Sequence, residues 1–114
     1  MNKELIEYLD VPDWNKNVQI SEGEAPEVML SLYIFFRRLI NNDCLIIEVT
    51  DKELRCKKHI NGLVIDKMEF PIVQLDVPST MRKYFDLVLS RDSVINSNLE
   101  LVYESNDKVV YRIL

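Results

Sequence analysis

Three strand-like runs follow one another between Cys44 and Phe70, and they constrain the fold more than any other part of the chain. The run from Cys44 to Thr50 is rich in β-branched residues, and the run from Leu54 to Ile60 alternates along its length. Asn61-Gly62 then predicts a tight hairpin turn, because both residues tolerate a positive φ angle. Strands joined by such short turns pair antiparallel, so this segment predicts an antiparallel sheet.

Two apolar periodic patterns predict helices on either side of these strands. The first helix has Ser21 as its candidate N-cap and runs to about Ile40, and the second has Ser79 as its N-cap and ends near 91–93. Because the first helix is apolar around most of its circumference, we expect it to be buried on more than one side. Further short strands are expected at 17–20, 72–77, 99–104 and 108–114.

The order of these elements, β-α-β-β-β-β-α-β-β, predicts an α+β fold with antiparallel sheets and two helices on one face. A chain of 114 residues has the size of one ordinary domain. We assign 17–114 to that domain and 1–16 to an N-terminal arm or short helix. The arm either docks on its own domain or serves as a contact for a partner.

Composition and charge exclude several classes of protein. Hydrophobic residues make up 47% of the chain and charged residues 29%, which is typical of a folded domain rather than a disordered one. A net charge of −5 argues against a protein that coats nucleic acid over its whole surface, although a local basic face stays open. Cys44 and Cys56 are expected to be reduced, buried thiols, with a disulfide as the alternative.

The location of the protein is expected to be the cytoplasm, or the nucleus in a eukaryote or its virus. The first residues lack a signal-peptide pattern. The longest uncharged run, Val28 to Phe36, is nine residues, far below the roughly 20 that span a bilayer, so no membrane partner is expected.

The sequence holds no recognisable catalytic motif, and we expect a protein that is not an enzyme and needs no cofactor. His59 is the single histidine, and it has no nucleophile placed beside it by sequence. The spacing of Cys44, Cys56 and His59 does not match a zinc site, so no metal is expected. Gly23 and Gly62 are the two glycines, which leaves no glycine-rich phosphate loop.

Two sets of residues are candidates for binding, each with a structural alternative. The basic set either contacts DNA phosphates or is ordinary solubilising charge. The apolar set either meets a partner or a second copy, or packs in the core. The basic set is Arg37, Arg38, Lys57, Lys58, Arg82, Lys83 and Arg91. The apolar set is Leu5, Leu9, Trp14, Tyr33 and Phe36.

One block of the chain, Val49 to Arg55 followed by Gly62 to Pro71, resembles a stretch of the archaeal and eukaryotic DNA sliding clamps. A later block, Val77 to Ser90 followed by Leu99 to Leu114, is similar to the second βαββ unit of a clamp domain. The resemblance covers about residues 17–114. It implies one clamp domain whose helices contact DNA phosphates without reading bases, where family subunits carry two or three such domains.

Three functional hypotheses follow, and the third is an enzyme whose site the sequence does not reveal. The first is a non-enzymatic, clamp-like module that self-associates into a homo-oligomer and supports DNA transactions through its basic helix face. The second is a small acidic inhibitor, immunity-type or viral adaptor protein that binds one protein partner through charge complementarity.

Overall fold

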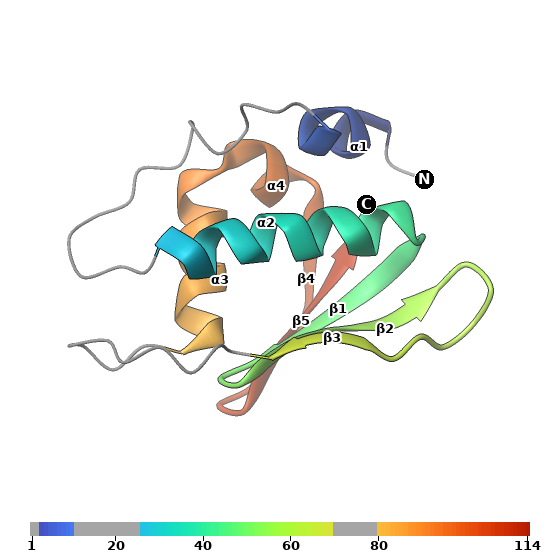
Figure 1. Ribbon diagram of the computed structural model, residues 1–114. Coiled ribbons are helices and arrows are strands. Elements are labelled where there is room, and N and C mark those ends of the chain that lie inside the picture. The colour runs from blue at the N-terminus through green and yellow to red at the C-terminus, as the bar shows by residue number, and fades with distance from the viewer. Residues whose placement is uncertain (1–2, 11–25, 70–79) are drawn as a thin grey trace.

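The computed structural model describes residues 3–10, 26–69 and 80–114. Within them the fold is α+β, with four helices and one five-stranded antiparallel sheet, which confirms the fold class expected from sequence (Figure 1). The helices are α1 (Lys3–Asp10), α2 (Pro26–Asn41), α3 (Met81–Arg91) and α4 (Ser93–Ser97). The strands are β1 (Cys44–Thr50), β2 (Glu53–His59), β3 (Asp66–Glu69), β4 (Leu99–Glu104) and β5 (Lys108–Ile113). The strands expected at 17–20 and 72–77, the N-caps Ser21 and Ser79, and Trp14 lie outside the described residues.

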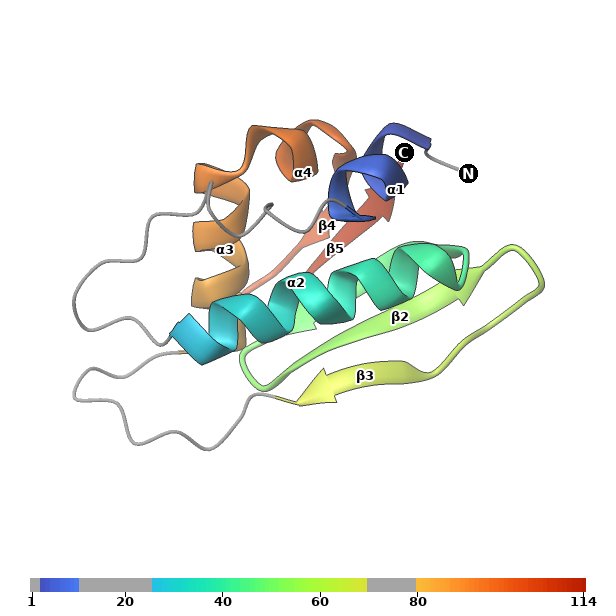
Figure 2. The same cartoon turned by 45° about the horizontal axis from the view of Figure 1, so that its top comes forward.

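The sheet has the strand order β3-β2-β1-β5-β4, and each neighbouring pair is antiparallel. In the central strand, Val49 lies opposite Leu54 on one side and Val109 on the other, and all three side chains are buried. Because residues opposite one another share a face, these three define the face that packs against the helices. The other face of the sheet is left uncovered by the helices (Figure 2).

The N-terminal helix α1 packs on its own domain. Its residues Leu5 and Leu9, four apart and therefore on one helix face, are both buried and belong to the same core as α2. Arg37 of α2 also forms an ion pair with Asp10 at the end of α1 (3.0 Å). These contacts dock residues 3–10 of the expected arm on the domain, which is one of the two alternatives that the sequence left open.

A buried carboxylate, Asp92, joins three of the helices. Its Oδ1 atom accepts hydrogen bonds from the backbone N–H groups of Val94 and Ile95, both at 3.1 Å, and so caps α4. Its Oδ2 atom accepts from the phenol groups of Tyr8 in α1 (2.6 Å) and Tyr33 in α2 (2.7 Å). We expected one helix to end near 91–93 and did not expect α4, although an aspartate at an N-cap position is its usual signal.

Two local predictions were wrong by one residue. The second long helix α3 begins at Met81, and the hydroxyl of Thr80, rather than Ser79, accepts the hydrogen bond from the N–H of Lys83. The β2–β3 turn is centred on residues 60–61 instead of Asn61-Gly62. His59 and Gly62 exchange backbone hydrogen bonds of 2.8 and 3.2 Å, and Gly62 follows the turn with φ 131°.

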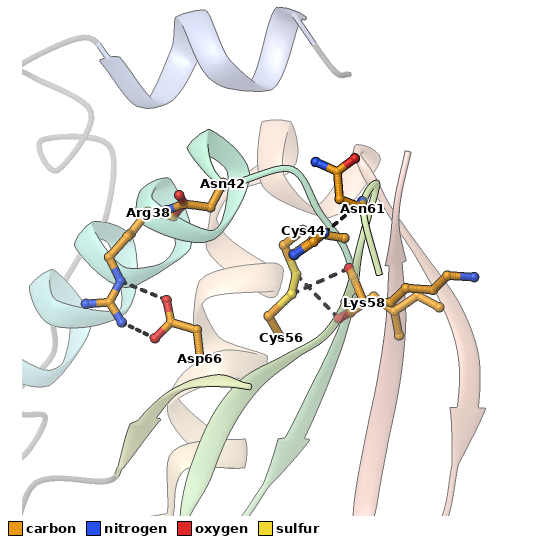
Figure 3. The surroundings of a disulfide bond; sticks show 9 residues. Arg38, Asn42, Cys44, Cys56, Lys58, Asn61 and Asp66 are labelled. Carbon is orange, nitrogen blue, oxygen red and sulfur yellow. Dashed lines mark hydrogen bonds and ion pairs between the residues drawn. A yellow bond between two sulfur atoms is a disulfide. The ribbon is translucent and has the colours of Figure 1, made fainter. Parts of the chain in front are cut away.

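Cys44 and Cys56 form a disulfide between β1 and β2, and the expectation of reduced thiols was therefore wrong (Figure 3). The pairing register of the two strands shifts between Cys44 and Ile47, and Cys56 lies opposite Ile47. This irregularity brings the two cysteine Cα atoms to 6.0 Å, a separation that a disulfide can span. The register shift depends on how the strands pair, and the spacing of the cysteines along the chain gives no sign of it.

Candidate binding surfaces

Two of the titratable side chains, His59 and Tyr33, have structural hydrogen bonds within the chain. The described residues contain no group of three or more His, Cys, Asp and Glu side chains that could hold a metal ion. The ring of His59 accepts a hydrogen bond from the backbone N–H of Asn61 (2.8 Å), which gives it a structural role at the hairpin turn. Burial and the hydrogen bond to Asp92 raise the pKa of Tyr33 far above its usual value, so this phenol stays neutral and acts as a structural donor.

The two arginines of α2 in the basic set are engaged within the chain. Arg37 pairs with Asp10. Arg38 lies over the ring of Phe35, 4.8 Å from its centroid. Arg38 also forms a bidentate ion pair with Asp66, in which its Nε donates to Oδ2 at 3.1 Å (Figure 3). Both pairs are partly exposed, so each contributes little stability, but each neutralises a charge that a DNA phosphate would otherwise meet.

The cations of α3 differ in how available they are. Arg82 donates to the backbone oxygen of Ser105 (2.9 Å) and lies 3.8 Å from the carboxylate of Glu104, so it ties the helix to the β4–β5 hairpin. Lys83 is exposed, and Arg91 is half-buried. Of the basic set on this helix, Lys83 is therefore the side chain best placed to meet another molecule.

The open face of the sheet carries a cluster of charges around Glu48. This side chain is buried although it points away from the helices, because the longer side chains of neighbouring strands cover it. Arg55 approaches its carboxylate to 2.7 Å, Lys108 to 3.4 Å and Lys57 to 3.8 Å. Burial alone would raise the pKa of Glu48, but the hydrogen bond and charge of Arg55, with the two lysines, outweigh it and hold the pKa below its usual value.

The cluster does not make the open face strongly basic. Arg55 also lies 3.7 Å from Glu53, and the neighbouring Lys67 is paired with Glu53 (3.7 Å) and Glu69 (3.0 Å). Cations and carboxylates therefore alternate across this part of the sheet. Lys58 of the basic set lies on the same strand as Arg55, and its side chain is exposed.

Strand β4 is an edge of the sheet, and among the described strands it pairs with β5 alone. Three successive apolar residues on it are about half exposed: Leu101 at 53%, Val102 at 55% and Tyr103 at 51%. An edge strand has backbone N–H and C=O groups free for pairing, and exposed apolar side chains add to its tendency to take up another strand. No local pattern in the sequence marks these residues as an edge, because strand order is set by long-range pairing.

Four members of the apolar set are core residues in this structure. Leu5, Leu9, Tyr33 and Phe36 are all buried, and the interior of a single chain accounts for their apolar character. The fifth member, Trp14, lies outside the described residues. A partner that meets the described surface would therefore contact other residues first.

Comparisons with known proteins identify no relatives: no family model matches the chain, and neither the curated proteins nor the solved structures include a significant match. Within the described residues, no helix is both long and apolar enough to cross a membrane.

Proposed function

We propose that this protein is a non-enzymatic binding module that acts by pairing strand β4 with a strand of another protein chain. The observation that carries the proposal is the exposed apolar edge at Leu101, Val102 and Tyr103. Addition of a strand to an exposed sheet edge is a recurring mode of protein recognition, in which backbone hydrogen bonds give affinity and side chains give specificity. The proposal keeps two expectations from the sequence, self-association or a single protein partner, but assigns the contact to β4 instead of to a basic helix face or an acidic surface.

Photo-crosslinking at β4 tests the proposal in the cells that make the protein. Tyr103 is replaced by benzoylphenylalanine, a photoreactive residue of similar shape, and Leu63 in the β2–β3 connection is replaced in the same way as a matched control. Leu63 is 74% exposed, so random collisions label it at least as readily. We expect a discrete adduct from position 103 and none of the same mass from position 63. Equal labelling at the two positions, or no adduct at 103, would refute binding along β4.

Contact with the DNA backbone is a second candidate function, supported by the exposed lysines Lys58 and Lys83. The resemblance to sliding clamps suggests the same ligand. A contact made through these lysines is electrostatic, so it weakens steeply as salt is raised. This candidate function predicts that the protein is found in the cytoplasm or the nucleus. The Cys44–Cys56 disulfide is instead more typical of an oxidising compartment.

A further inference from the structure

Asn61 is the one asparagine in the sequence that is followed by glycine. An asparagine in this position can lose its side-chain amide without an enzyme, because the backbone nitrogen of the next residue can attack its side-chain carbonyl carbon. The attack needs access for water and a next residue that leaves its backbone nitrogen uncovered, as glycine does. Asn61 is exposed, and it belongs to the β2–β3 connection, which extends past the end of α2 (Figure 2).

The structure leaves the reacting atoms of this turn open. Nothing lies within 4 Å of the position that a Cβ atom would occupy on Gly62. The side-chain amide of Asn61 points away from the Cys44–Cys56 disulfide (Figure 3).

Two backbone hydrogen bonds restrain the turn. The N–H of Gly62 donates to the oxygen of His59 at 3.2 Å, and the N–H of His59 donates to the oxygen of Gly62 at 2.8 Å. This pair is an isolated bridge, and β3 begins only at Asp66. The turn can therefore open locally while the β2–β3 ladder stays paired.

The other asparagines in the described ranges are held differently. Asn41 and Asn96 lie within helices. The side-chain nitrogen of Asn42 donates to a backbone oxygen of α2 at 2.8 Å, and that of Asn98 donates to a backbone oxygen of α4 at 2.7 Å. Asn106 is exposed like Asn61, but an aspartate follows it, so a side chain crowds the attacking nitrogen.

We propose that Asn61-Gly62 is a site of spontaneous deamidation, with water as the co-reactant. The backbone nitrogen of Gly62 forms a bond to Cγ of Asn61, and the side-chain nitrogen leaves as ammonia with the proton that the backbone nitrogen loses. The product is a five-membered cyclic imide. Water then adds to one of the two imide carbonyl carbons and breaks its bond to nitrogen. Opening at Cγ gives aspartate, and opening at the backbone carbonyl gives isoaspartate.

The reaction changes the charge and the backbone of the hairpin. Either product adds one negative charge between Ile60 and Leu63, whose side chains are 60% and 74% exposed. Isoaspartate also adds one carbon to the backbone before Gly62, so the two hydrogen bonds with His59 cannot both keep their geometry. The β2–β3 connection lies at the opposite end of the strand order from β4, so this reaction is independent of strand pairing at β4.

Incubation of the purified protein in mildly alkaline buffer tests the site. Ion-exchange chromatography should resolve a species with one more negative charge, and peptide mapping by mass spectrometry should place both products at position 61. Two exposed hydrogen bonds must open first, so the rate should be at most about a hundredfold below that of a free peptide with the sequence of residues 58–65. A slower rate would overturn the proposal, because it would show that the folded turn protects Asn61.

Two variants separate this site from others. Asn61→Gln should lose the more acidic species, because its longer side chain cannot close the five-membered ring. The matched control Asn106→Gln changes the other exposed turn asparagine and should retain that species. An acidic species that forms at the same rate in Asn61→Gln would overturn the proposal.

Limited proteolysis tests the effect on the hairpin. The isoaspartate form should be cut within residues 60–65 faster than Asn61→Asp, which has the added charge but an unchanged backbone length. Equal rates of cutting would refute the loosening of the turn by isoaspartate.

Discussion

Replacement of Asp92 by alanine should destabilise the fold more than any other single change to a polar side chain in the described structure. Asp92 is 3% exposed and accepts four hydrogen bonds, two from the first turn of α4 and two from tyrosine hydroxyls. Loss of an N-cap costs about 0.5–2 kcal/mol. The buried hydroxyl of Tyr33 would also lose its hydrogen bond to Asp92, a change that costs about 1–3 kcal/mol more. Tyr8 is only partly buried and can turn to water. The expected loss is therefore about 1.5–5 kcal/mol of unfolding free energy.

Urea unfolding followed by circular dichroism measures this loss, because the midpoint falls in proportion to the change in free energy when the slope is constant. Asp92→Asn is the matched control. It keeps one side-chain oxygen to cap α4, and its amide can donate to the tyrosine oxygens, so it should cost less than the alanine variant. Tyr33→Phe should cost more than Tyr8→Phe, because Tyr33 is buried. A loss below about 1 kcal/mol for Asp92→Ala would show that the hydrogen bonds of Asp92 do not hold the helices together.

Three further predictions concern the disulfide, the Glu48 cluster and the helix cations. The Cys44–Cys56 disulfide closes a loop with a sequence separation of 12. On the chain-entropy model, its reduction should lower the unfolding free energy by about 3 kcal/mol. Urea unfolding with and without reductant measures this loss. The pKa of Glu48 is depressed in the folded state, so its contribution to stability is present above its unfolded pKa of about 4.3 and is lost as the pH falls through the lower folded value. Glu48→Gln should flatten the fall in melting temperature over that acidic range, and an unchanged profile would contradict this. Lys83→Glu should weaken any binding in DNA titrations at two salt concentrations, without loss of stability. Arg82→Glu should lower the melting temperature, because it breaks the contact with Ser105.

The parts of the fold that depend on local pattern could be predicted from the sequence. The apolar periodicity of the first long helix and the alternation of 54–60 both gave elements that the structure contains. Boundaries set by a single hydrogen bond were less certain, since either Ser79 or Thr80 could supply a capping hydroxyl. Features set by long-range pairing could not be predicted, because the position of β4 at the edge and the meeting of Cys44 with Cys56 depend on strand order and register.

The candidate binding residues show the same division between local pattern and long-range pairing. The apolar character of Leu5 and Tyr33 made them candidates either for contact with a partner or for packing in the core, and the chain itself buries both side chains. The charge of Arg38 and Arg82 makes each a candidate for binding phosphate, and the structure places a carboxylate beside each. A side chain that is already buried or ion-paired within the chain gains little from contact with a partner. The surface left for binding is therefore the one that folding leaves unsatisfied, and among the described residues its strongest example is the apolar edge of β4, where backbone groups and side chains both face outward.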